Sequence, residues 1–183
     1  MAEIKLYNFE IPREHLVKNK DNKKWQEIRR ASNIFASLVL EMKEGIVPGE
    51  MMGNHELEEL YLCSDSIAVI VNISLSVELA FKAILEHQGN LKIGHKLDDL
   101  FSNLNARTKK LIIRYLNLNR CFLEDRYNNE QEFISALKPI NELYVKYRYF
   151  FDEKYDLKNF NKDLTLLIKL FYFSVKYINY KLH

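Results

Sequence analysis

A glutamate and a lysine stand one helical turn apart, at Glu78 and Lys82, within the segment 74–104. On a helix these side chains share one face, with the carboxylate nearer the N-terminus, which is the favourable order for an ion pair. The residues around them are mostly apolar, so the pair should be at least partly buried, where a charge needs a partner. The pair is therefore either a structural ion pair or part of a functional polar cluster.

His95 follows in the sequence GHKLDDL, at or just before the start of another apolar-spaced run. One interpretation is a loop histidine that faces solvent or hydrogen-bonds a backbone carbonyl. The alternative is that His95 points toward Glu78 and Lys82. An imidazole beside a carboxylate could carry a proton near neutral pH.

Arg148 lies in YVKYRYFFDEKY, the most aromatic part of the chain. An arginine among tyrosines and phenylalanines can stack on the rings and still present its guanidinium to a carboxylate or a phosphate. Asp152, one turn later, is a simple structural partner for it. We expect Glu78, Lys82, His95 and Arg148 to share one polar pocket, where the second, third and fifth predicted helices meet.

Three cations, Arg107, Lys110 and Arg114, recur at helical spacing and define what we call the basic strip. Lys109 lies beside it, and Arg120 and Arg126 extend the positive charge along the chain. Such a strip is a candidate surface for the phosphates of a nucleic acid. The alternative is an ordinary solvated helix face.

Length and composition indicate one globular domain. The chain has 183 residues with only 5 glycines and 3 prolines, which favours long helices over a sandwich of short strands. We predict an N-terminal arm over residues 1–20 and a single helical-bundle domain over residues 21–183. The net charge of +2 is too small for a purely electrostatic grip on nucleic acid, so any such contact must be local.

Several classes of protein are disfavoured by what the sequence lacks. The two cysteines, Cys63 and Cys121, form no CxxC pair, and the N-terminus does not resemble a signal peptide, so a cytoplasmic protein with reduced thiols is expected. The apolar stretch 66–85 contains polar and charged residues and predicts a buried helix rather than a membrane span. No nucleotide-binding loop or zinc-binding HExxH motif occurs, so no metal and no cofactor are predicted.

The apolar spacing predicts an all-α, up-and-down bundle of about five to six helices. Helices are expected over residues 21–45, 54–87, 97–104, 106–118, 129–151 and 161–182. Pro139 should kink the fifth helix, because proline lacks the N–H that a helix interior requires. The last helix is apolar on two sides, which places it either at the centre of the bundle or at a subunit interface.

The placement of Glu78, Lys82 and His95 in VELAFKAILEHQG and KIGHKLDDLF, with the later YRYFFDE, resembles the HEPN superfamily. The resemblance covers residues 25–182. It implies a small helical bundle, commonly a symmetric homodimer, in cytoplasmic proteins of toxin–antitoxin, phage-defence or CRISPR-associated systems. Many such proteins are ribonucleases, and others are non-catalytic partners of nucleotidyltransferases. By this resemblance His95 and Arg148 would be catalytic, with Glu78 and Lys82 in support.

Catalytic members of the superfamily carry an arginine followed, after four to six residues, by a histidine. None of the eight arginines here has a histidine in that window. Ribonuclease chemistry would therefore require His95 and Arg148 to converge in space. Two functions remain open: an RNA-acting or RNA-binding component of a prokaryotic defence or stress module, and a non-catalytic module for dimerisation or for binding a partner protein.

Overall fold

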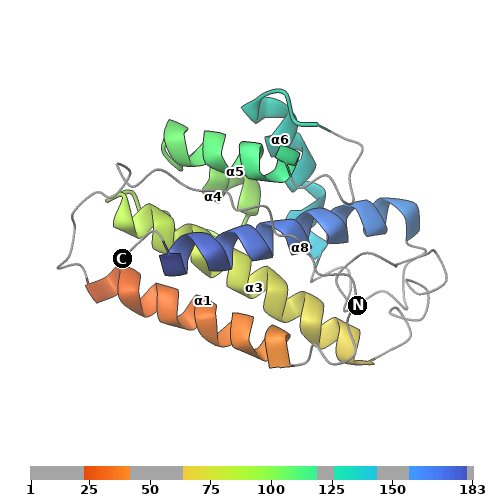
Figure 1. Cartoon of the computed structure of the whole chain (residues 1–183), viewed down its shortest axis with the longest axis horizontal. Coiled ribbons are helices and arrows are strands. Elements are labelled where there is room, and N and C mark those ends of the chain that lie inside the picture. Colours follow the sequence, from red (N-terminus) through yellow and green to blue (C-terminus); the bar gives the residue numbers. More distant parts are fainter. Residues whose placement is uncertain (1–22, 42–63, 119–125, 144–156, 181–183) are drawn as a thin grey trace.

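The computed structural model describes residues 23–41, 64–118, 126–143 and 157–180, and these ranges confirm the all-α prediction (Figure 1). They contain six α-helices, one 3-10 helix and no strand. The elements in chain order are α1 (Lys23–Glu41), α3 (Ser64–His87), α4 (Leu97–Ser102), α5 (Ala106–Leu118), α6 (Glu130–Leu137), η3 (Pro139–Glu142) and α8 (Leu157–Tyr180). The predicted arm over residues 1–20 lies outside the described residues, as do both cysteines.

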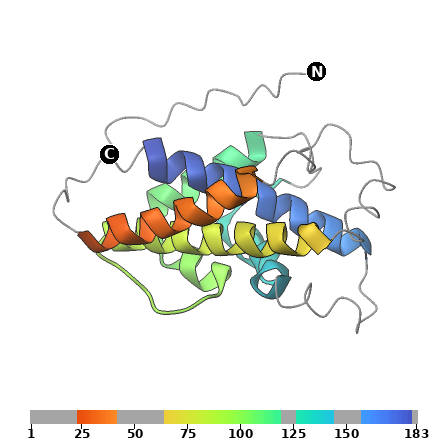
Figure 2. The same ribbon diagram turned by 90° about the horizontal axis from the view of Figure 1, so that it is seen from below.

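Helix α3 is the centre of the bundle. It packs against α1 on one side and against α8 and α4 on others. The four longest helices, α1, α3, α5 and α8, alternate in direction along the chain (Figures 1 and 2). The shorter helices α4 and α6 lie with α5 on the side of the bundle away from α1 (Figure 1).

The apolar side chains of α3 explain its central position. Val77, Ala80, Phe81 and Ile84 are completely buried, so apolar side chains leave the helix in several directions and each needs a covering neighbour. The stretch Ala68–His87 is long and apolar enough to cross a membrane, but 67% of it is buried within the bundle. This burial is typical of the core helix of a soluble protein.

Small and amide side chains hold α1 against its neighbours. Ser32 and Ser76 exchange hydrogen bonds between α1 and α3: each hydroxyl donates to the backbone carbonyl of the other, at 2.9 and 3.1 Å. Asn33 of α1 and Asn179 of α8 pair their side-chain amides in both directions, at 2.9 and 3.0 Å. These bonds satisfy polar groups that the packing removes from water.

Two predicted helix ends are confirmed. After α3, Gly89 adopts a positive φ of 71°, and the N–H groups of Gly89 and Asn90 donate to the carbonyls of Glu86 and Leu85, as in a Schellman motif. At the start of α6, the Asn129 side chain accepts a hydrogen bond from the backbone N–H of Glu132. The Glu132 carboxylate returns to the backbone N–H of Asn128, which completes a variant of the capping box.

The predicted helix over residues 129–151 is interrupted at Pro139. The α-helix ends at Leu137, and the chain continues through Lys138 into the 3-10 helix η3. The disruption that Pro139 was expected to cause is present, but as a change of helix type rather than a kink within one α-helix. Residues 144–156, which include Arg148, lie outside the described part of the chain.

Helix α8 is covered on both apolar sides within its own chain. Leu164, Phe171 and Ile178 are buried on one seam, and Leu170 and Tyr177 are buried on the other. This burial supports the central position over the subunit interface. The two-sided pattern of α8 therefore gives no support for a dimer.

Trp25 and His87 join the first turn of α1 to the last turn of α3. Their rings meet edge to face with centroids 5.3 Å apart, and both residues are buried. Burial lowers the pKa of His87 below its ordinary value of 6.5, because the apolar surroundings disfavour the charged imidazolium.

The free energy of unfolding should therefore fall as the pH drops below about 6.5, since the unfolded chain binds the proton of His87 more readily than the folded chain does. Urea unfolding followed by circular dichroism at about pH 7.5 and about pH 5 measures this change. His87→Gln, which cannot take up the proton, should show a smaller loss. Equal losses in the two proteins would contradict this role for His87.

Candidate functional site

Glu78 is the hub of a polar cluster that consists of Glu78, Lys82 and His95. One carboxylate oxygen, Oε1, accepts a hydrogen bond from Lys82 Nζ at 2.6 Å and lies 2.9 Å from His95 Nδ1. The side chain of Glu78 is only 9% exposed, that of Lys82 is 17% exposed and that of His95 is 77% exposed. The cluster thus begins at the edge of the core and ends in solvent.

The tautomer of His95 follows from this geometry. An ionised carboxylate can only accept hydrogen bonds, so Nδ1 of His95 must carry the proton that it donates to Glu78. In the neutral ring Nε2 is then unprotonated and can accept a proton. Because most of the His95 side chain faces solvent, this arrangement suits proton exchange with a molecule bound outside the bundle.

His95 is positioned by the start of α4, two residues later. The N-cap residue Lys96 offers no side-chain hydrogen bond to the helix, and the cap comes instead from η3. Asn141 Oδ1 accepts from the backbone N–H groups of Leu97 and Asp98, at 2.7 and 3.3 Å, and Asn141 Nδ2 donates to Asp98. Sequence reasoning missed Asn141, because a cap supplied from 43 or 44 residues away leaves no local signal.

The structure brings together three of the four residues expected in the polar pocket. Glu78, Lys82 and His95 are in contact, whereas Arg148 lies outside the described residues. The expected pocket differs from what is observed in one respect: His95 is largely exposed rather than enclosed. The catalytic roles of His95 and Arg148 stay predictions.

The basic strip lies on α5, as predicted. Arg107, Lys110 and Arg114 are all exposed, while the opposite face of the helix buries Leu111, Ile112, Tyr115 and Leu116. Helix α5 contains a fourth cation, Lys109, and no acidic residue. The strip is thus the outward face of a helix whose inner face is firmly packed.

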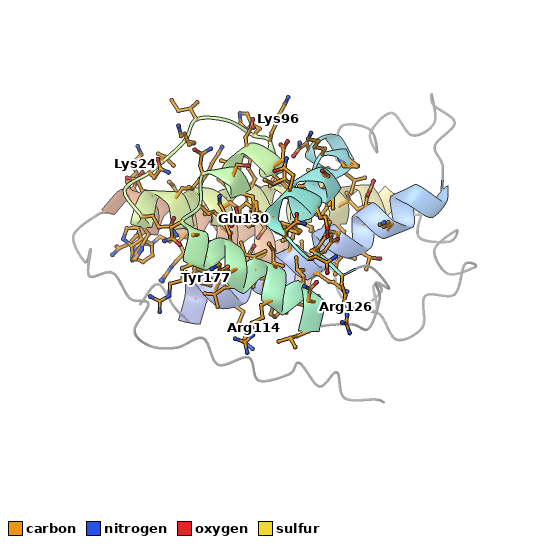
Figure 3. All side chains as sticks on the ribbon, turned by 90° about the horizontal axis from the view of Figure 1, so that it is seen from above. Lys24, Lys96, Arg114, Arg126, Glu130 and Tyr177 are labelled. Carbon is orange, nitrogen blue, oxygen red and sulfur yellow. The ribbon has the colours of Figure 1, made fainter. Side chains whose placement is uncertain are left out.

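Two other cations near the strip have different surroundings. Lys109 is turned away from the strip. Its Nζ lies 3.2 Å from Glu130 of α6 and 6.0 Å from the centre of the Phe101 ring of α4, so it connects α5 to these two helices. Arg126 is exposed, and in Figure 3 it projects from the same edge of the molecule as Arg114. Arg120 is outside the described residues.

Tyr177 of α8 fastens the first turn of α5 to the bundle. Burial raises the pKa of Tyr177, and a hydrogen bond with Thr108 together with the positive charge of Arg107 opposes that rise. Gln88, just after α3, adds a second connection: its amide donates to Thr108 Oγ1 at 2.9 Å and accepts from the backbone N–H of Asn105 at 3.0 Å. The strip is therefore held on a fixed support.

The polar cluster and the basic strip do not form one surface. Lys96, the neighbour of His95, projects from one edge of the molecule, and Arg114 projects from the opposite edge (Figure 3). In the described ranges, no group of three or more His, Cys, Asp or Glu residues could hold a metal ion.

Comparisons with known proteins give no relative: no protein-family model, no curated protein and no solved structure matches the chain. The resemblance to the HEPN superfamily therefore stays a prediction from the sequence.

We predict that Lys82→Met will lower the free energy of unfolding by about 1–3 kcal/mol, because the nearly buried Glu78 carboxylate loses the hydrogen bond from its closest cation. Glu78→Gln should restore much of this loss when added to Lys82→Met, since the uncompensated charge is then removed. Chemical denaturation of the wild type, both single variants and the double variant gives the coupling energy. Strictly additive losses would show that the two charges do not depend on each other.

Proposed function

We propose that this protein is an HEPN-like RNA-binding protein of the prokaryotic cytoplasm that acts as a homodimer in a defence, toxin–antitoxin or stress module. The observation that supports RNA binding is the basic strip: three exposed cations on one face of a helix that has no acidic residue. Cations of this kind neutralise phosphates and release the counterions condensed around them. The HEPN resemblance supplies the biological setting and the dimer.

The small net charge means that RNA binding would depend on a local group of cations. With a charge of only +2, the whole molecule has little attraction for a polyanion, so affinity must come from where the cations are concentrated. Arg107 and Arg114 can each present two parallel N–H groups to a phosphate, and Lys110 adds a point charge between them.

The polar cluster supports a second, catalytic candidate. His95 Nε2 would accept the proton of a ribose 2′-hydroxyl, and the 2′-oxygen would then attack the adjacent phosphorus. The bond to the 5′-oxygen breaks, the 5′-oxygen takes a proton from water, and a 2′,3′-cyclic phosphate is left on the other fragment. Glu78 would hold the ring through Nδ1, and Arg148 would stabilise the charge on the phosphoryl oxygens. Lys96, the neighbour of His95, projects from the edge of the molecule opposite to Arg114 of the strip, which favours RNA binding as the primary function (Figure 3).

A third candidate is the binding of a partner protein. Ile34 and Leu38, one turn apart on α1, are exposed, and adjacent exposed apolar side chains often mark a contact surface. This module would use the polar cluster only as internal support.

RNA binding should disappear when the strip loses its charge. For about three phosphate contacts, the affinity of single-stranded RNA should fall with a slope of about −2 in a plot of log K against log salt concentration. We expect Arg107→Ala/Lys110→Ala/Arg114→Ala to abolish this binding in fluorescence anisotropy. A matched control, Arg30→Ala/Lys92→Ala/Lys138→Ala, removes the same number of exposed cations from elsewhere and should retain most of the affinity. Equal losses in the two triple variants would disprove a specific role for the strip.

If the protein cleaves RNA, His95→Ala should reduce the cleavage rate by about 100-fold or more, the usual contribution of a general base. Glu78→Gln should reduce the rate less, because the imidazole remains but loses its fixed orientation. Gel analysis of a labelled RNA, with Arg148→Ala in parallel, measures these effects. Cleavage that persists in both His95→Ala and Arg148→Ala would eliminate the proposed pair.

A further inference from the structure

The outward face of α5 carries cations that can bind phosphates, and it has no aromatic ring on which a base could stack. The exposed residues of the helix are Ala106, Arg107, Lys110, Arg114 and Leu118, and none is aromatic. Proteins that bind single-stranded RNA usually stack its unpaired bases on aromatic rings, in addition to contacting the phosphates. Double-stranded RNA is instead bound mostly through its shape, its phosphates and its 2′-hydroxyl groups.

Three aromatic side chains that the structure describes behind α5 are used inside the bundle. Tyr177 is stacked on Phe173 with ring centroids 5.3 Å apart and is hydrogen-bonded to Thr108. Tyr115, on the inner face of α5, meets Phe173 edge to face at 5.3 Å. All three residues are buried, so none is available to a base.

The strip is also a rigid, straight row. At a rise of about 1.5 Å per residue, Arg107 and Lys110 are about 4.5 Å apart along the helix axis, and Arg107 and Arg114 are about 10.5 Å apart. Both ends of α5 are fixed: Gln88 bonds Thr108 at the start, and the Asn117 side chain donates to the Tyr127 carbonyl and accepts from its N–H at the end. A helix that is fixed at both ends loses little backbone freedom when it meets an equally regular phosphate backbone.

A duplex offers such a backbone, with a higher density of phosphate charge than a flexible single strand. Each phosphate neutralised on a duplex changes the salt dependence by about −0.9, compared with about −0.7 on a single strand. A row of cations without an aromatic ring for unpaired bases should therefore favour the duplex.

We infer that the basic strip binds double-stranded RNA through its phosphate backbone and does not read its sequence. This inference rests on the proposed RNA-binding function and names the class of RNA. Because the deep groove of an RNA duplex is too narrow for side chains to read its bases, α5 would lie across the backbone and not within that groove.

Fluorescence anisotropy with full-length protein tests this inference. The probes are two RNA duplexes of about 20 base pairs with unrelated sequences, and an unstructured oligouridine of the same length. At about 0.1 M salt we expect both duplexes to bind at least about fivefold more tightly than the single strand, with affinities within about twofold of each other. For three contacts the salt slope on the duplex should be about −2.7.

The outcomes separate this inference from the function on which it rests. Equal or tighter binding of oligouridine would overturn the preference for duplexes and leave RNA binding intact, whereas failure of all three probes to bind would overturn both. A difference of more than about tenfold between the two duplexes would show that bases are read.

Arg107 and Arg114 also make contacts within the chain, so the triple variant is supplemented by Lys110→Glu at an exposed position. We expect Lys110→Glu to weaken duplex binding by at least about tenfold without changing the thermal midpoint. Unchanged duplex affinity in Lys110→Glu would place the contact elsewhere.

Discussion

The structure depends on covering most of the circumference of α3. A helix whose completely buried residues include Val77, Ala80, Phe81 and Ile84 cannot face water along any large part of its circumference. Helices α1, α8 and α4 each cover part of it. The same requirement explains why α8 is apolar on two sides, since it lies between α3 and α5 and packs against both.

Glu78 is an exception within this apolar helix, and its surroundings show how the exception is tolerated. A carboxylate with so little exposure must find compensation within the protein. Lys82 supplies it from the same helix, and His95 supplies it from the chain that follows. His95, which contacts the buried carboxylate, is also the most exposed member of the cluster. It therefore links the edge of the core directly to solvent.

Local features of the sequence were sufficient to predict much of this arrangement. Gly89 and Asn129 marked helix ends through their backbone and capping preferences, and the spacing of Arg107, Lys110 and Arg114 predicted the exposed face of α5. The contact between Glu78 and Lys82 followed from their separation of one turn.

Contacts between distant segments could not be predicted in this way. Asn141 caps α4, Ser32 pairs with Ser76 across two helices, and Asn33 pairs with Asn179. In each case neither partner has a distinctive neighbourhood in the sequence, because the bond depends on how the helices are oriented in space. The sequence left open whether His95 faces solvent or Glu78, and the structure combines the two, since the ring contacts the carboxylate while most of the side chain is exposed.

The amide pair between Asn33 and Asn179 joins residues that are 146 positions apart. During synthesis on the ribosome, α1 can associate with α3 early, but the side of α3 that α8 covers must wait until residues 157–180 have emerged from the exit tunnel. A nascent chain therefore exposes an apolar ridge of α3 from the emergence of residues 64–87 until residues 157–180 follow. Such a ridge is the kind of surface that chaperones of growing chains bind.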